Sequence, residues 1–490
     1  MNDTKFNPML LTDFYKVGHP FQYPKGTTSV YSNLTARGSR IPEIQSTVFF
    51  GLQYFIKEYL MRQFDENFFN RDKAEVMCDY RRRVKSALGS DLPSYKHIED
   101  LHDLGYLPIK VKALPEGSRV PLRVPYLTIV NTLPEFYWLT NFIESLMSSV
   151  LWQPITSATI AAEYRAILDK YAEETGMPKE FVQWQGHDFS FRGMSSLESA
   201  ALSGMGHLLS FTGTDTIPAI DGLETYYNAD SDTELIGGSV PATEHSVMCS
   251  GEEGGELETF KRLITEVYPS GVVSIVSDTW DLWKVCTEYL PALKDEILAR
   301  DGKVVIRPDS GDPVDIICGN PQSGNVNERK GVVELLWDVF GGTVSDTGHR
   351  ILNSHIGAIY GDSITRERAT SISERLKENN FASQVVFGIG SYTYQYNTRD
   401  TFGMAMKATY VEIDGEGVEI SKDPVTDDGL KKSAKGLLTV RKSSDGMYME
   451  DCCTYEEENS GELEVVFQDG ELIKDQTLSE IRSRLIKEKK

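Results

Sequence analysis

Residues 304–313 read VVIRPDSGDP, a short apolar run that passes directly into a polar turn. A run that is apolar throughout is typical of a strand buried on both faces of a parallel sheet, and proline and glycine shape the turn after it. The same design of strand, turn and helix recurs from about residue 180 onward. Its other polar segments are FVQWQGHDFSFRG (181–193), FTGTDT (211–216), GSVPATEHS (238–246), VVSIVSDTWD (272–281), IGAIYGDS (356–363) and VVFGIGS (385–391).

These units predict an α/β fold, an irregular (β/α) barrel of about seven or eight units that occupies residues 151–395. The loops at the carboxyl ends of barrel strands build the active site, and the polar turns stand at those ends. Outside this range the pattern changes to short strands, hairpins and amphipathic helices. We therefore expect a second, discontinuous α+β domain made of residues 1–150 and 396–490. The polar stretch 319–331 is predicted to be an exposed loop.

Composition excludes several classes of protein. A chain of 490 residues can bury two cores, and its net charge of −23 disfavours binding to nucleic acid or to an anionic membrane. The six cysteines form no CxxC pair, so neither a zinc site nor a disulfide framework is predicted. We find no secretion signal and no membrane-spanning run, and we expect a cytoplasmic protein.

Two turns carry residues suited to a phosphorylated ligand. Arg307 offers a planar fork for phosphate or carboxylate, and Asp309 could accept from sugar hydroxyls or help to hold a metal. A structural ion pair explains these two residues equally well. Gly388 and Gly390 leave room for a phosphate to approach backbone N–H groups, although a plain turn is the alternative.

Further candidates follow other strands. Asp362, beside Gly361, could accept from ribose hydroxyls or cap a helix. Phe189 and Arg192 suggest a flat ring stacked on the phenyl group with a phosphate near the guanidinium, while a core phenylalanine is the simpler explanation. Helix capping is the usual role for a residue placed like Asp215.

His245 closes the set of candidates. A solitary histidine is more often structural, and no second histidine stands at metal-ligand spacing to indicate zinc. Adjacent residues seldom reach each other, so Asp278 from another turn is as good a partner for the imidazole as Glu244.

Taken in order, these segments resemble the nicotinamide phosphoribosyltransferases of the type II phosphoribosyltransferase family. The resemblance runs from near residue 10 to about residue 423 and rests on TDFYKVGH (12–19), FFGLQY (49–54), YWLTNFIE (137–144), HDFSFRG (187–193), GTDT (213–216), GSVPATEHS, VSDTWD (276–281), IRPDSGDP (306–313), GDS (361–363), FGIGS (387–391) and TRD (398–400). It implies transfer of the phosphoribosyl group of 5-phosphoribosyl 1-pyrophosphate to nicotinamide, giving nicotinamide mononucleotide and pyrophosphate for NAD salvage. It also implies Mg²⁺ on the pyrophosphate and a homodimer, formed through the α+β domain, with shared active sites. ATP would be a co-substrate that phosphorylates His245.

The resemblance also implies roles for individual residues. Phe189 and Tyr15 of the partner subunit would sandwich nicotinamide, and Asp215 would accept from its carboxamide. The other substrate-binding candidates are Ser274 near the carboxamide, Asp309, Gly361 and Asp362 at the ribose, Gly390, Ser391, Arg399 and Lys407 at the 5′-phosphate, and Arg37 and Lys422 at the pyrophosphate. Asp13, Arg192 and Ser239 are further substrate-binding candidates. The candidate catalytic residues are His245, Asp278, Arg307 and Asp309.

Three positions depart from the family pattern. Ser391 replaces the second glycine of the phosphate turn, and its Cβ narrows the approach. Trp184 stands where a tyrosine is familiar and Gly357 where a basic residue is familiar, so the lining of the barrel and its charge differ. Residues 319–331 are also longer than the pattern.

Chemistry supports this interpretation. Glycosyl transfer from a pyrophosphate donor needs positioning and charge stabilisation, and the pyridine nitrogen needs no base because its lone pair is free. A histidine is then better explained as a phosphoryl acceptor. If Asp215 faces the carboxamide, it repels the carboxylate of nicotinate, so nicotinamide is the predicted substrate. The alternatives are a nicotinate phosphoribosyltransferase and a non-catalytic nucleotide-binding regulatory dimer.

Overall fold

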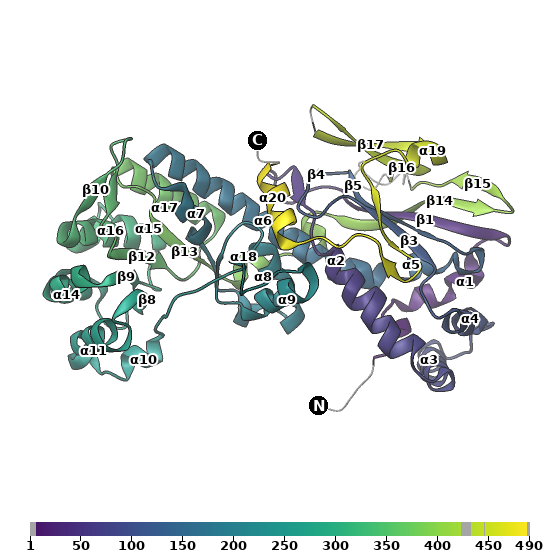
Figure 1. The fold of residues 1–490 in the computed structure, drawn as a ribbon, viewed down its shortest axis with the longest axis horizontal. Coiled ribbons are helices and arrows are strands. Elements are labelled where there is room, and N and C mark those ends of the chain that lie inside the picture. The colour runs from purple at the N-terminus through teal and green to yellow at the C-terminus, as the bar shows by residue number, and fades with distance from the viewer. Residues whose placement is uncertain (1–5, 423–432, 445, 488–490) are drawn as a thin grey trace. The chain divides into compact units, whose positions relative to one another are not determined.

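The computed structural model describes residues 6–422, 433–444 and 446–487 (Figure 1). Its contacts divide the chain into two compact units. Within the described residues, no helix is both long and apolar enough to cross a membrane. Unit 1 comprises Met1–Thr159, Gly222–Ala229 and Asn397–Lys490, and unit 2 comprises Ile160–Asp221 and Asp230–Tyr396.

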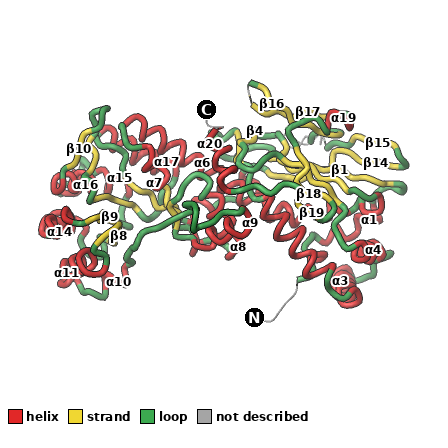
Figure 2. Tube along the Cα trace, in the orientation of Figure 1, coloured by secondary structure: helices red, strands yellow, loops and turns green. Residues whose placement is uncertain are grey.

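Unit 2 is built on a parallel sheet whose strands are covered by helices (Figures 1 and 2). The strand order is β7-β6-β13-β12-β9-β8, and each neighbouring pair is parallel. All five residues of β12 are buried, as expected for an apolar strand with both faces covered. The strands are β6 (Gly186–Asp188), β7 (Gly213–Thr214), β8 (Ser270–Val276), β9 (Asp301–Arg307), β12 (Ile356–Tyr360) and β13 (Val385–Ile389).

A short irregular segment, residues 238–242, closes this sheet into a barrel. Gly238 pairs with Gly213 of β7 at one edge, and Ala242 pairs with Ser274 of β8 at the other edge. Backbone hydrogen bonds of 2.7 to 3.0 Å flank both pairs. The predicted irregular (β/α) barrel is therefore confirmed. Residues 238–242 take the place of a seventh strand, and this is the least regular position in the barrel.

Helices follow the strands because capping residues stand directly after the polar turns. Asp312 accepts hydrogen bonds from the first turn of α15 (Pro313–Cys318), and Thr365 caps α17 (Arg366–Glu378) in the same way. The prediction that residues 319–331 form a loop is wrong in its second half, because Asn325 caps a helix that begins at Val326. The other helices are α7 (Lys179–Gln185), α8 (Leu197–His207), α9 (Ile217–Tyr227), α10 (His245–Cys249), α11 (Glu256–Arg262), α12 (Leu282–Lys284), α13 (Leu290–Ala292), α14 (Lys294–Ala299), α16 (Val326–Phe340) and α18 (Ser391–Gln395).

Unit 1 is an α+β structure that draws its strands from both ends of the chain, as the sequence predicts (Figure 1). Its main sheet is antiparallel, in the order β15-β14-β1-β5-β3-β18-β19, with β1 paired to β14 and β5. The strands are β1 (Thr27–Ala36), β3 (Ile109–Ala113), β5 (Pro125–Asn131), β14 (Met404–Ile413), β15 (Glu416–Glu419), β18 (Glu464–Gln468) and β19 (Glu471–Leu472); two small sheets pair β2 (Ser46–Val48) with β4 (Arg119–Pro121) and β16 (Leu437–Ser443) with β17 (Gly446–Cys453). The main helices are α3 (Lys73–Leu88), α4 (Lys96–Leu104) and α20 (Leu478–Lys487), together with the first half of α6 (Glu144–Thr175), whose residues from Ile160 onward belong to unit 2.

Candidate active site

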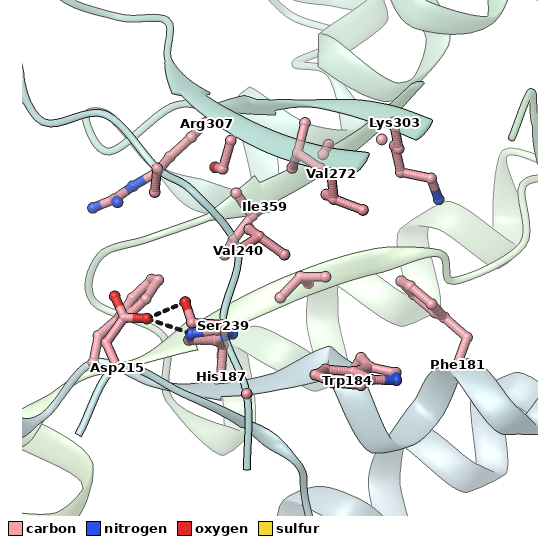
Figure 3. Close-up of a pocket in the computed structure, with 18 of the residues that line it drawn as sticks. Phe181, Trp184, His187, Asp215, Ser239, Val240, Val272, Lys303, Arg307 and Ile359 are labelled. Carbon is pink, nitrogen blue, oxygen red and sulfur yellow. Dashed lines mark hydrogen bonds and ion pairs between the residues drawn. The ribbon is translucent and has the colours of Figure 1, made fainter. Parts of the chain in front are cut away.

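A cavity of about 360 Å³ lies inside the barrel of unit 2 (Figure 3). Lys303, Val305 and Arg307 of β9 all line it, because side chains two residues apart in a strand point to the same face. The remaining lining residues are Phe181, Trp184, His187, Phe189, Asp215, Gly238, Ser239, Val240, Ala242, Val272, Ser274, Gly357, Ala358, Ile359, Gln384 and Val386.

Phe189 lies at one end of this cavity, directly after β6. The guanidinium carbon of Arg307 is 5.1 Å from the centroid of its ring. A Cβ atom at Gly388 would stand 2.6 Å from the same ring, so Gly388 is required for packing rather than for a phosphate. The Phe189 ring therefore packs between the Arg307 guanidinium and the backbone of β13 at Gly388, and these two contacts set its position.

Arg307 and Asp309 form a two-pronged ion pair across the turn after β9. Nε and a terminal nitrogen of Arg307 donate to the two carboxylate oxygens of Asp309 at 3.1 and 2.9 Å. A Cβ atom at Gly361 would overlap Asp309 and lie 2.9 Å from Arg307 Nε. The pair therefore packs closely against the backbone at the end of β12.

Asp215 projects into the cavity from the end of β7 (Figure 3). His187 Nε2 and Ser239 Oγ lie 2.8 and 2.5 Å from its Oδ1. Partial burial alone would raise its pKa, but hydrogen bonds from His187 and Ser239 hold the pKa of Asp215 below its ordinary value. Among the described residues, Oδ2 accepts no hydrogen bond, and the side chain is 44% exposed. An ionised carboxylate oxygen is thus available to a donor in the cavity.

Ser274 adds a second polar group to the same cavity. Its side chain is buried in β8, and its hydroxyl has no hydrogen-bond partner among the described residues. Buried hydroxyl groups normally have a partner. A ligand with a polar atom is the natural partner at this position.

His245 and Asp278 meet outside the cavity lining, as one alternative from the sequence anticipated. His245 Nε2 lies 3.4 Å from Asp278 Oδ1, and the imidazole is 51% exposed while the carboxylate is 6% exposed. Asp278 Oδ2 accepts from the backbone N–H of Asp309 at 2.9 Å and from Ser310 Oγ at 2.6 Å. The carboxylate that faces His245 is thereby fixed to the turn that carries the Arg307 pair.

Carboxylates crowd the carboxyl ends of β8, β9 and β12. Burial first, and then the charges of Asp362, Asp278 and Asp309, raise the pKa of Tyr360. Asp362 itself accepts from Ser363 Oγ at 2.6 Å. This edge of the barrel is acidic and suited to hydroxyl groups or to a cation.

Ser391, one of the departures from the family pattern, packs against Gly193, which has no side chain to obstruct it. It begins α18, and a Cβ atom at Gly193 would lie 2.5 Å from the Ser391 Cβ. Arg192, on the same turn as Gly193, is exposed. At Gly390 a Cβ atom would meet no described residue within 4 Å, so no packing in the described part of the chain requires this glycine.

In unit 1, Asp13 and Tyr15 line a separate cavity of about 480 Å³ together with Arg399. Tyr15 is 61% exposed, and Lys16 Nζ lies 5.0 Å from the centroid of its ring. Asp13 accepts a hydrogen bond from the hydroxyl of Ser145. A large exposed aromatic ring beside a cation is suited to a planar partner.

The cationic candidates gather in the same unit. Burial lowers the pKa of Lys407, and the charges of Arg37, Lys422 and Arg399 lower it further, while Glu144 opposes them. Arg37 Nε donates to the carbonyl of Gly403 at 3.0 Å. Four cations close enough to influence one another form a site for a highly charged anion.

The structure thus divides the predicted residues into two groups. Unit 2 holds Phe189, Arg192, Asp215, Ser239, His245, Ser274, Asp278, Arg307, Asp309, Gly361, Asp362, Gly390 and Ser391, and unit 1 holds Asp13, Tyr15, Arg37, Arg399, Lys407 and Lys422. Sequence reasoning missed the contact of His187 with Asp215 and the presence of Lys303 in the cavity. Alternate residues of a strand point to the same face, so Lys303, four residues before Arg307, could have been predicted to line the same cavity.

Comparisons with known proteins agree along the whole chain. A family model described as the nicotinate phosphoribosyltransferase (NAPRTase) family matches residues 184–471, and a model of the nicotinamide phosphoribosyltransferase N-terminal domain matches residues 7–111. A protein named nicotinamide phosphoribosyltransferase from Acinetobacter baylyi is 54% identical, over 98% of this chain and 97% of its own. A protein of the same name from Xanthomonas campestris is 33% identical, over 97% of each chain.

Solved structures share the fold. Nicotinate-nucleotide pyrophosphorylase from Pyrococcus furiosus superimposes with a TM-score of 0.58 at 14% identity, covering 100% of this chain and 96% of its own. Human nicotinic acid phosphoribosyltransferase superimposes with a TM-score of 0.52 at 16% identity, covering 97% and 93%. The likeness extends over both units.

Proposed function

Because the chain belongs to the nicotinate phosphoribosyltransferase family and is a phosphoribosyltransferase, we propose that its acceptor is nicotinamide. The donor is 5-phosphoribosyl 1-pyrophosphate, and the products are nicotinamide mononucleotide and pyrophosphate, in NAD salvage. The names of the relatives from Acinetobacter baylyi and Xanthomonas campestris support this choice. All six cysteines are free, which suits the cytoplasmic location that we also propose.

The observation that carries the proposal is the ionised carboxylate of Asp215 in the cavity. Its free oxygen can accept from the NH₂ of a carboxamide, and the buried hydroxyl of Ser274 can donate to the carboxamide oxygen. The pyridine ring would stack on Phe189. A carboxylate in place of the amide would meet Asp215 as a like charge.

The transfer step needs little covalent help from the protein. The lone pair of the pyridine nitrogen forms a bond to C1′ of the ribose while the bond from C1′ to the pyrophosphate oxygen breaks. The pyridine becomes a cation and the electron pair leaves with pyrophosphate. Phe189 would hold the ring in line, and carboxylates such as Asp309 and Asp362 would hold the ribose hydroxyls.

Mg²⁺ fits this site as a partner of the pyrophosphate. The described residues contain no group of three or more His, Cys, Asp or Glu side chains that would hold a metal unaided. Mg²⁺ is commonly held by one or two carboxylates together with substrate phosphates. The acidic edge around Asp362, Asp278 and Asp309 suits this role. The ion would neutralise charge on the leaving group.

We propose His245 as the phosphoryl acceptor that couples ATP to synthesis. A carboxylate 3.4 Å from Nε2 favours the tautomer with its proton on Nε2, which leaves the Nδ1 lone pair free. The Nδ1–P bond forms as the bond from the γ-phosphorus to ADP breaks, and water later cleaves the Nδ1–P bond to give phosphate. His245→Ala should abolish ATP hydrolysis while nicotinamide binding persists. Unchanged ATP hydrolysis by the variant would show this assignment to be wrong.

We further propose a homodimer in which unit 1 of one subunit completes the site of the other. The exposed ring of Tyr15 would cover the second face of nicotinamide, and the cationic group around Lys407 would bind the phosphates. Mixing Tyr15→Ala with Asp309→Ala tests this directly. Heterodimers with one intact site should recover activity that neither variant has alone, whereas no recovery would contradict shared sites.

One assay tests the reaction itself. Purified protein is given nicotinamide, 5-phosphoribosyl 1-pyrophosphate and Mg²⁺, with and without ATP, and mononucleotide and pyrophosphate are measured. Nicotinate in place of nicotinamide serves as the comparison. Product from nicotinate at an equal or higher rate would favour nicotinate as the acceptor. No product from either base would favour the alternative of a non-catalytic, nucleotide-binding regulatory dimer.

A further inference from the structure

Lys303 stands at the end of the barrel cavity that is opposite to the proposed nicotinamide site. Figure 3 shows Lys303 and Phe181 on one side and Arg307 and Asp215 on the other. Lys303 and Arg307 are four residues apart in β9, which corresponds to a separation of about 13 Å along the strand. The cavity is therefore long enough to hold a second small molecule beyond the base.

Among the residues that the structure describes, the ammonium of Lys303 has no counter-ion. Its contact within the described residues is the ring of Phe181, whose centroid is 5.6 Å from Nζ. Burial lowers the pKa of Lys303, and no neighbouring carboxylate acts against this effect. Arg307 differs, because its charge is balanced by Asp309. An unpaired, partly buried ammonium is an unsatisfied group that a ligand can stabilise.

Gly357 makes room for this side chain. A Cβ atom at Gly357 would lie 3.3 Å from Lys303 Cδ and 4.0 Å from Nζ. The lysine thus occupies the space over β12 that a side chain at Gly357 would fill. A positive charge is thereby present in this part of the barrel although position 357 is a glycine.

We propose that this distal end of the cavity is a second binding site, for a small molecule with one carboxylate and an aromatic body. The carboxylate would pair with Lys303, and the amide of Gln384, which lines the same cavity, offers a further donor. Phe181 and Trp184 supply flat faces, and Val272 supplies an apolar wall.

The lining distinguishes this ligand from other anions. One ammonium and one amide match a single negative charge, whereas a phosphate dianion requires several donors or a cluster of cations. The rest of the distal lining is valine and aromatic, which favours an apolar body over a sugar. The site is separate from the proposed transfer reaction and does not depend on which base is the acceptor.

Calorimetric binding at neutral pH, without substrates, tests the proposal. The probes are 3-phenylpropionate and its neutral analogue 3-phenylpropionamide, which differ only in the charged group. The wild type should bind the acid about tenfold more tightly than the amide, in line with a charge-assisted hydrogen bond. Lys303→Met, which keeps the length of the side chain, should lose this preference, and Lys303→Arg should keep it.

Three results would overturn the proposal. The first is a wild type that binds the acid no more tightly than the amide, or does not bind it at all. The second is a Lys303→Met variant that binds the acid as well as the wild type does. The third is a preference that Asp215→Asn alters and Lys303→Met does not, because the probe would then lie at the nicotinamide end. Since no turnover is measured, these outcomes leave the proposed reaction untouched.

Discussion

Replacing Asp215 with asparagine should reduce the discrimination between nicotinamide and nicotinate. The change keeps the shape of the side chain and keeps an oxygen to accept from His187 and Ser239. It removes the negative charge, which the lowered pKa of Asp215 shows to be present at neutral pH. The variant therefore isolates the effect of charge on the choice of substrate.

The size of the effect follows from Coulomb's law. Two like charges about 4 Å apart repel by about 4 kcal/mol at an effective dielectric constant of 20 and by about 1 kcal/mol in water. Asp215 is 44% exposed, so solvent screens it substantially and an intermediate value applies. A repulsion of about 2 kcal/mol corresponds to a preference of roughly 30-fold. Asp215→Asn should reduce the ratio of the two kcat/KM values by about this factor.

The measurement is kcat/KM for each base at saturating 5-phosphoribosyl 1-pyrophosphate, for the wild type and the variant. Ser239→Ala is the matched control, because it removes one hydrogen bond to Asp215 and leaves the charge in place. Its ratio should stay close to that of the wild type. An unchanged ratio in Asp215→Asn, or an equal fall in both variants, would refute the charge argument.

Two other predictions concern packing and pH. Gly388→Ala should raise KM for nicotinamide about tenfold, because its Cβ would lie 2.6 Å from the Phe189 ring. Gly390→Ala should leave the melting temperature unchanged, since its Cβ meets no described residue within 4 Å. Equal melting temperatures and equal KM values for the two variants would contradict this. Burial raises the pKa of Glu256 to about 7, above its ordinary value of 4.5, so its contribution to stability is lost as pH rises through that range. Glu256→Gln should therefore gain melting temperature relative to the wild type between pH 5.5 and pH 8, and a constant difference across this range would count against it.

The fold class was predictable because it depends on local patterns. Apolar runs of strand length mark β9 and β12, and the residues just after them, such as Asp309 and Asp362, are placed at one edge by parallel pairing alone. The same reasoning explains why the polar turns converge. Short-range signals therefore sufficed for the barrel and for much of the candidate site.

Contacts that depend on strand order were not predictable. His187 reaches Asp215 because β6 and β7 are neighbours, with His187 opposite Gly213, and no local pattern specifies that order. Residues 238–242 gave no strand signal, and in the structure they pair through single residues at each edge. The helix start at Val326 was hidden by polar residues that serve as its cap and first turn.

The closing segment of the barrel has a consequence for motion. Single-residue pairs hold it at both edges, so it should detach more readily than any full strand of the sheet. Ser239 lies within it and His245 follows it by a few residues, so a side chain beside the proposed base and the proposed phosphoryl acceptor belong to one continuous segment. Detachment of that segment would move both groups together, so that binding of the base and phosphorylation of His245 would respond to the same motion.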